Sequence, residues 1–177
     1  MADNQFTLIA ITPPEPLDDE AARIATLLRS GFDRVHLRHP AMPVSELEKI
    51  IAAIPSELRG AISLHDHFHL APAYGIGGIH LNGRNPQAPR GWEGITSRSC
   101  HSVAEVEASR GLDYVTLSPV FDSISKPGYR GVNFDSLPTG IIIVALGGVT
   151  PEKFNLLKSL GYAGAAMLSA AWTKSQK

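Results

Sequence analysis

The chain contains a single cysteine, Cys100, and the next residue is a histidine, His101. Such a pair could form a nucleophile with its base, part of a metal site, or no functional unit. Residues 102–105 (SVAE) have the S-x-x-E pattern of a capping box, which predicts that a helix begins after Ser102. His101 then ends the preceding strand, where neighbouring side chains point to opposite faces. We therefore predict that the two residues do not form a dyad, that Cys100 packs beneath the helix, and that His101 is the candidate acid/base.

The same alternation predicts that Ser97, Ser99 and His101 share one face of the strand, and Arg98 and Cys100 the other. A polar row that ends in a histidine is typical of the mouth of a barrel, where barrel enzymes hold their catalytic groups. The N-terminus of the following helix favours neutral imidazole, the form that a general base requires. The alternative interpretation is a histidine that caps a loop or is hydrogen-bonded in the core.

Histidines are also crowded earlier in the chain. His65, His67 and His69 form an H-x-H-x-H motif, and His80 follows. Imidazoles on one strand face can bind Zn²⁺, as in metal-dependent hydrolases. Barrel hydrolases of that type take further ligands from later strands, and the only histidine after His80 is His101. We therefore predict no metal site from this motif.

Two apolar runs late in the chain are each followed by small residues. Two glycines follow residues 143–146, and a Ser-Ala pair follows residues 163–168. In (β/α)₈ barrels the loops after strands 7 and 8 often bind a phosphate through backbone N–H groups. Glycine lets the backbone approach the anion closely. A simple turn is the alternative for the glycine pair alone. The sequence predicts phosphate binding by Gly147, Gly148, Ser169 and Ala170.

A further polar group lies in residues 118–131, a loop bounded by Gly and Pro. Two hydroxyls and a lysine in such a loop are typical of an anion clamp, with a solvated surface loop as the alternative. The residues concerned are Ser123, Ser125 and Lys126.

The elements that must position these groups follow from eight short apolar runs at fairly even intervals. They cover residues 6–11, 34–38, 61–65, 78–81, 95–101, 114–117, 141–146 and 163–168. Helical spacing over residues 18–30, 44–54 and 150–160 lies between some of them. Strands that alternate with helices predict a parallel sheet, and eight such units predict a compact (β/α)₈ TIM barrel.

The usual barrel has about 250 residues, so a chain of 177 residues must be trimmed. Residues 82–94, between the fourth and fifth strands, have the composition of a loop and leave little room for a helix. An open doubly wound sheet is the alternative fold. That fold expects a Gly-rich turn after its first strand, where this chain has the proline-rich segment 11–19 (ITPPEPLDD). We therefore favour the barrel.

Length and composition set broad limits. With 177 residues, 44% of them hydrophobic, the chain can form one core, and we predict a single domain over residues 1–177. A net charge of −1 gives no electrostatic case for nucleic acid or an anionic membrane. One cysteine excludes an internal disulfide and fits a cytoplasmic protein. The N-terminus lacks the pattern of a signal peptide. A homo-oligomer is compatible with these features.

Across nearly its whole length the chain resembles the thiamin phosphate synthase / TenI family of thiamin biosynthesis. The segments that carry the resemblance are HLRHP (36–40), SLHDHFHLAPAYGIGGIHL (63–81), SRSCHSVAEVEASRGLDYVTLSPVFDSISK (97–126), IIIVALGGVTPE (141–152) and AGAAMLSAA (163–171). The resemblance implies a small-molecule phosphate ester, thiazole phosphate or thiamin phosphate, as the ligand. It assigns phosphate or pyrophosphate binding to Ser123, Ser125, Lys126, Gly147, Gly148, Ser169 and Ala170.

The family has two activities. The synthase joins a pyrimidine pyrophosphate to a thiazole phosphate and needs Mg²⁺. Its Q-x-R-x-K motif is matched here by HLRHP, which keeps Arg38 and has Pro40 in place of the lysine. Its Asn-Asp pair is matched by His65-Asp66, and a second aspartate is matched by Asn85. The resemblance thus implies substrate binding by Arg38 and Asp66, but one carboxylate holds a hard cation less tightly than two.

The TenI branch is a metal-free thiazole tautomerase, whose proposed acid/base is the histidine of R-S-x-H-S, matched here by His101. The altered cation positions favour this branch. We therefore predict a thiazole tautomerase without a cofactor and with weak or absent synthase activity. The Mg²⁺-dependent thiamin phosphate synthase is the alternative, and a non-catalytic relative that binds thiazole or thiamin phosphate is the second alternative.

Overall fold

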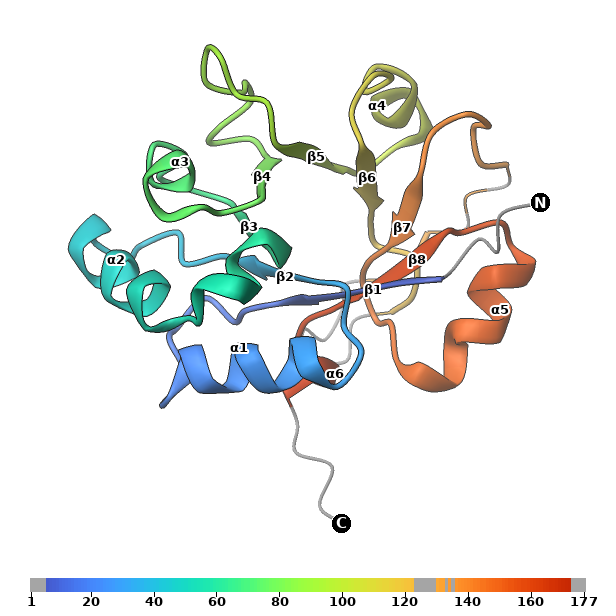
Figure 1. Ribbon diagram of the computed structural model, residues 1–177. Helices are drawn as coiled ribbons and strands as arrows, with labels where there is room; N and C mark the ends of the chain where they lie inside the picture. Colours follow the sequence, from blue (N-terminus) through green and yellow to red (C-terminus); the bar gives the residue numbers. More distant parts are fainter. Residues whose placement is uncertain (1–5, 123–129, 133, 135, 173–177) are drawn as a thin grey trace.

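A computed structural model describes residues 6–122, 130–132, 134 and 136–172. Eight parallel strands form a closed barrel in which each strand pairs with the next and β8 pairs with β1 (Figure 1). The strands are β1 (Thr7–Ile11), β2 (Arg34–Leu37), β3 (Ile62–Leu64), β4 (Gly78–Leu81), β5 (Ile95–Cys100), β6 (Tyr114–Leu117), β7 (Ile143–Ala145) and β8 (Gly164–Met167). The barrel is closed where Thr7 lies opposite Gly164. The predicted TIM barrel is confirmed, and the open sheet is excluded.

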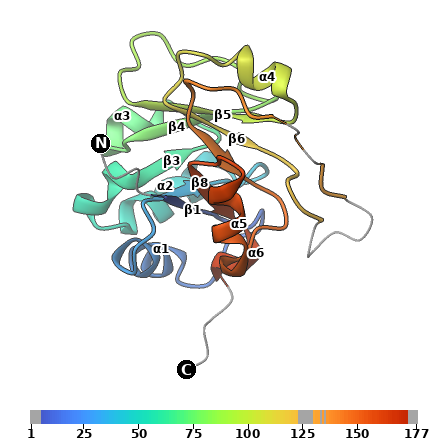
Figure 2. The ribbon, with the colours of Figure 1, turned by 90° about the vertical axis from the view of Figure 1, so that its right-hand side faces the viewer.

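The helices are short and lie outside the strands (Figure 1). They are α1 (Glu20–Arg29), α2 (Val44–Ala53), α3 (Leu70–Tyr74), α4 (Val103–Glu107), α5 (Phe154–Ser159) and α6 (Ser169–Trp172), with 3₁₀ turns η1 (Ser56–Ala61) and η2 (Pro151–Lys153). Figure 2 brings α5 and α6 to the front beside β8. Residues 82–94 contain turns and bends but no helix, as predicted. Within the described residues, no helix has the length and apolar character needed to cross a membrane.

The ends of two helices show where the local sequence signals succeed and fail. Ser102 caps α4 as predicted, because its Oγ accepts a hydrogen bond from the backbone N–H of Glu105 at 3.2 Å. Thr150, the first residue of the helix predicted over residues 150–160, makes no capping side-chain bond. That helix begins instead as the 3₁₀ turn η2 with a proline in its first turn, and becomes α-helical only at Phe154.

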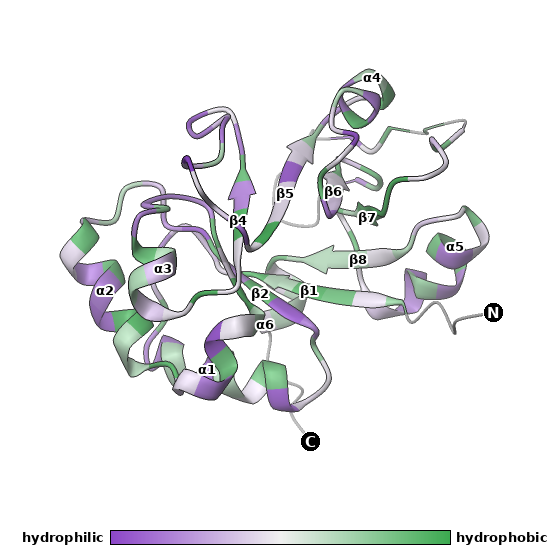
Figure 3. Cartoon of the chain, turned by 45° about the horizontal axis from the view of Figure 1, so that its top comes forward, coloured by the Kyte–Doolittle hydropathy of each residue, from purple (hydrophilic) through white to green (hydrophobic). Residues whose placement is uncertain are grey.

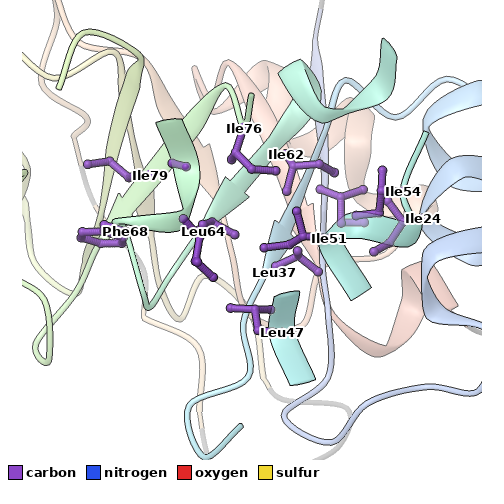
Figure 4. Packing of buried hydrophobic residues seen from close by; sticks show 14 of the residues in the cluster. Ile24, Leu37, Leu47, Ile51, Ile54, Ile62, Leu64, Phe68, Ile76 and Ile79 are labelled. Carbon is purple, nitrogen blue, oxygen red and sulfur yellow. The ribbon is translucent and has the colours of Figure 1, made fainter. Parts of the chain in front are cut away.

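The hydrophobic core lies between the outer face of the barrel and the helices. Alternate strand residues such as Leu37, Leu64 and Ile79 point outward and are at most 2% exposed. They pack against Ile24 of α1 and Ile51 of α2, as Figure 4 shows. Truncation of such a buried aliphatic side chain to alanine costs about 2–5 kcal/mol. This layer holds the strands in register and so fixes the inward-facing side chains.

The interior of the barrel has an apolar side and a polar side. Ile9, Val144 and Ala166, from β1, β7 and β8, form an apolar cluster. The inward residues of β2 to β5 are instead mostly polar, and they include Arg34 and the buried His36 and Ser97. Figure 3 shows the contrast between hydrophilic stretches on β4 and β5 and the hydrophobic colour of β7 and β8. Several of these buried polar groups bond one another, as His80 does with Ser97 and Ser99.

Candidate functional site

The sequence-predicted residues that the structure describes lie at one end of the barrel. Arg38 follows β2, Asp66 follows β3, and His101 follows β5, while the glycine pair follows β7 and Ser169 begins α6 after β8. Because all eight strands are parallel, their carboxyl ends form one mouth. Ser123, Ser125 and Lys126 lie outside the described residues.

Arg38 offers a cation at this mouth that is not paired with any other described residue. Its backbone N–H donates to Oγ1 of Thr12, just after β1, at 2.8 Å. Within the described part of the chain, its guanidinium forms no hydrogen bond or ion pair. A guanidinium without an internal partner can form a bidentate contact with a phosphate group.

Asp66, by contrast, is already paired. Arg84 donates from Nε and Nη2 to the two carboxylate oxygens at 3.0 and 2.9 Å, in a bidentate arrangement. Asn85 Nδ2 adds a bond to Asp66 Oδ1 at 2.9 Å and one to the carbonyl of His65 at 3.0 Å. The loop after β4 therefore neutralises the one carboxylate that the synthase pattern retains.

His101 is exposed at the mouth and is held from one side only. Its Nδ1 lies 3.2 Å from both the carbonyl oxygen and the hydroxyl of Ser118, at the end of β6. Its backbone N–H donates to Glu105 Oε2 at 2.7 Å. An Nδ1–H that donates to the Ser118 carbonyl leaves Nε2 unprotonated, which is the form a general base needs.

Cys100 faces away from His101. It is fully buried in the outer core, and its Sγ lies 3.7 Å from the hydroxyl of Ser109. Burial raises the pKa of the Cys100 thiol. On the opposite face Ser97 and Ser99 point into the barrel, where both contact His80. The predicted alternation of the strand is therefore confirmed, and the two adjacent residues do not form a dyad.

The glycine pair has a second role beyond the one predicted. Both residues have positive φ, 95° at Gly147 and 59° at Gly148. A Cβ at Gly148 would lie 2.2 Å from the carbonyl oxygen of Asp122, and one at Gly147 would lie 2.9 Å from Pro119 Cα. Glycine is thus needed for the loop after β6 to pack on this turn. The backbone N–H groups of the pair donate to no other described residue, which leaves them available to an anion.

Inside the barrel, below the mouth, the structure brings together three buried histidines that the sequence analysis did not associate. His36, His65 and His80 each offer one ring nitrogen, and these atoms lie within 4.8 Å of one another. His36 Nδ1 is 2.9 Å from His65 Nε2, and His36 Nε2 is 2.6 Å from the hydroxyl of Tyr114. The rings of His65 and His80 stack with centroids 4.3 Å apart.

These imidazoles are neutral at physiological pH. Burial, followed by the charges of neighbouring groups, lowers the pKa of His36 and of His65 well below 6.5. Burial alone lowers the pKa of His80 to about 3. Neutral imidazole is both a hydrogen-bond acceptor and the protonation state that binds metal ions.

The H-x-H-x-H motif does not form a unit. Only His65 of the three points into the barrel, whereas His67 lies 3.4 Å from the carbonyl of Met42 and His69 is exposed. The cluster could have been found from the strand alternation. His36, His65 and His80 have the inward parity of three consecutive strands, a signal that the motif itself obscured.

Fold and mouth define this chain as a (β/α)₈ barrel with groups for a small anionic ligand at the carboxyl ends of its strands. A family model described as thiamine monophosphate synthase matches residues 8–171. The chain belongs to this family of thiamin biosynthesis, whose substrates are small phosphate esters.

Relatives with assigned names agree. The chain is 28% identical to a thiamine-phosphate synthase of Salinibacter ruber, over 87% of this chain and 74% of that protein. It is 27% identical to a thiamine-phosphate synthase of Syntrophomonas wolfei, over 96% of this chain and 90% of that protein. A solved thiamine phosphate pyrophosphorylase from Bacteroides thetaiotaomicron superposes with a TM-score of 0.78 at 31% identity, over 96% and 86%. These names favour the synthase and give no support to the tautomerase that the sequence patterns favoured.

Proposed function

We propose that this chain is a thiamin phosphate synthase, which joins a pyrimidine pyrophosphate to a thiazole phosphate with release of pyrophosphate. The observation that carries the proposal is that named relatives matching 87% and 96% of the chain are thiamine-phosphate synthases. The retained Arg38, Asp66 and glycine pair at one mouth support it. The reaction needs two anionic groups held a short distance apart, which one mouth can provide.

The two anions would take different sides of the mouth. The thiazole phosphate would bind the backbone N–H groups of Gly147 and Gly148, with Ser169 and Ala170 beside them. The pyrophosphate would bind Arg38, whose guanidinium has no partner in the described part of the chain. The resemblance adds Ser123, Ser125 and Lys126 to the anion ligands of this proposal.

The described residues at this mouth fit Mg²⁺ with a single carboxylate ligand. In proteins Mg²⁺ is commonly held by one or two carboxylates together with substrate phosphates. Asp66 offers one carboxylate, 14% exposed, and Arg84 must yield an oxygen to the ion. When bound, Mg²⁺ would neutralise charge on the departing pyrophosphate. Because Asn85 is not a carboxylate, most of the affinity for the ion must come from the substrate.

Replacement of Arg38 tests the pyrophosphate side. Arg38→Met removes a charged hydrogen-bond donor worth about 1.5–3 kcal/mol, so kcat/KM for thiamin phosphate formation should fall by about 10- to 150-fold. Arg90→Met, which removes an exposed arginine from the loop after β4, is the matched control and should change little. Equal kcat/KM values for the two variants would show that Arg38 does not bind the leaving group.

The tautomerase is a second candidate because of one observation: among the described residues the cation position has a single carboxylate, Asp66, and Arg84 already pairs with it. For this reaction a single acid/base is sufficient, and His101 with its open Nε2 supports that role. His101→Asn should then lower tautomerisation of carboxythiazole phosphate by about 10²–10⁴-fold, and Cys100→Ala should change it little. The ultraviolet change on ring aromatisation measures both. A Cys100→Ala protein without turnover beside an active His101→Asn protein would contradict the assignment.

A further inference from the structure

We propose that the barrel interior of this chain binds one divalent first-row metal ion, with Zn²⁺ preferred, through His36, His65 and His80. This proposal concerns a second site, below the mouth, and does not depend on the synthase reaction. At positions 36 and 65 the family pattern described above has Gln and Asn, so the cluster is not part of that pattern.

The geometry carries the proposal. Around a tetrahedral Zn²⁺ with Zn–N bonds of about 2.0–2.1 Å, ligand nitrogens lie roughly 3.4 Å apart. In the barrel the three candidate nitrogens lie within 4.8 Å of one another, and the closest pair, His36 Nδ1 and His65 Nε2, is 2.9 Å apart. Small ring movements therefore suffice. The histidines come from β2, from the end of β3 and from β4, so adjacent strands fix their backbones.

Two of the three histidines, His36 and His80, already have a partner for the ring nitrogen that would not bind the metal. A ligating histidine usually donates its other ring N–H to a fixed acceptor. When His36 Nδ1 is the ligand, its Nε2–H can donate to the Tyr114 hydroxyl at 2.6 Å. His80 can use either nitrogen, because Ser97 lies 2.7 Å from Nδ1 and Ser99 lies 2.8 Å from Nε2.

The barrel wall next to His80 carries further polar side chains. Ser99 contacts His80 and lies opposite Thr116 in the register of β5 and β6. The hydroxyl of Thr116 is fully buried and has no hydrogen-bond partner among the described residues. A water bound to the metal would give that hydroxyl a partner, as in three-histidine sites that keep an open position.

The neutral state of the three histidines also favours a metal ion as the ligand. All three imidazoles are neutral, so no proton has to be displaced from a charged ring before the ion binds. The guanidinium groups of Arg34 and Arg38 are close enough to lower the pKa values of His36 and His65. These positive charges also repel a divalent cation, which weakens its binding. Imidazole nitrogens suit Zn²⁺ better than Mg²⁺, which prefers oxygen ligands.

The test is metal binding by the full chain. Wild-type protein, first treated with a chelator, is dialysed against ZnCl₂ and analysed for bound metal, and Co²⁺ is added separately to record the visible spectrum. We expect one Zn²⁺ per chain, a raised Tm, and the absorption of tetrahedral Co²⁺ with nitrogen ligands. Absence of stoichiometric Zn²⁺, or an octahedral Co²⁺ spectrum, would overturn the proposal.

Variants locate the site. His80→Gln should abolish stoichiometric binding, and Tyr114→Phe, which keeps all three ligands, should weaken it by about 10- to 100-fold. His69→Asn, an exposed histidine outside the cluster, is the matched control and should bind like the wild type. Binding that survives in His80→Gln, or is lost in His69→Asn, would place the metal elsewhere. If His80→Gln does not fold, Tyr114→Phe and the wild-type Co²⁺ spectrum decide the question.

Discussion

Asn85→Asp restores a second carboxylate beside Asp66 and tests how the mouth would hold Mg²⁺. Asn85 Nδ2 donates to Asp66 Oδ1 at 2.9 Å and to the His65 carbonyl at 3.0 Å. The substitution removes both bonds and brings two carboxylates together, with Arg84 as their shared partner. A bound Mg²⁺ would offset the repulsion between the two carboxylates. Without the ion, this repulsion destabilises the variant.

The size of the effect follows from the charges. Two unit charges about 4 Å apart interact by about 1 kcal/mol in water, so an added carboxylate gains about 2 kcal/mol from a divalent ion. That value corresponds to a roughly 30-fold lower Mg²⁺ concentration at half-maximal rate. Without Mg²⁺ the variant should lose about 1–3 kcal/mol of stability, because two hydrogen bonds of about 0.5–1.5 kcal/mol each are gone.

The assay is thiamin phosphate formation at increasing Mg²⁺ concentration, together with Tm measured with and without the ion. Gln87→Glu is the control, since it adds the same charge to an exposed position of the same loop. An unchanged Mg²⁺ requirement in Asn85→Asp would refute the reasoning. So would an equal shift in Gln87→Glu, because general electrostatics would then explain the effect.

Two further predictions concern stability. Burial alone would lower the pKa of His39, but its hydrogen bond to Glu20 at 2.7 Å and the charge of that carboxylate raise it above 6.5. The raised pKa makes this stabilisation complete below about pH 6.5, and it is lost as pH rises through the folded pKa. His39→Gln should therefore cost about 3–5 kcal/mol at pH 5 and less at pH 8 in urea unfolding; an equal cost at both pH values would contradict the pair. Gly148→Ala should destabilise the fold by more than the roughly 1–2 kcal/mol of a left-handed alanine, because its Cβ would collide with the Asp122 carbonyl. Gly31→Ala, with positive φ but no atom within 4 Å, is the control; equal losses in denaturant unfolding would show that the collision is relieved.

Much of the fold could be predicted because the sequence signals are local. Gly78–Leu81 and Tyr114–Leu117 were expected as strands with these same bounds. Residues 61–65 and 141–146 predict longer strands than Ile62–Leu64 and Ile143–Ala145, because the sequence pattern extends beyond the paired residues on both sides.

The candidate site also has parts that could be predicted from the sequence and parts that could not. The separation of Cys100 from His101 follows from strand parity and one capping box, both of which are local. The pairing of Asp66 with Arg84 depends on how two loops meet, which no spacing in the sequence encodes. The cluster of His36 with His80 follows from inward parity across three strands, a local signal that the H-x-H-x-H motif obscured.

The most direct test of the proposed function is product analysis with the purified wild-type chain. The protein is incubated with pyrimidine pyrophosphate and thiazole phosphate, with and without Mg²⁺, and separately with carboxythiazole phosphate. We predict Mg²⁺-dependent formation of thiamin phosphate and pyrophosphate in equal amounts, with half-maximal rate only at high Mg²⁺. Aromatisation of carboxythiazole phosphate without Mg²⁺, combined with no thiamin phosphate at any Mg²⁺ concentration, would contradict this prediction.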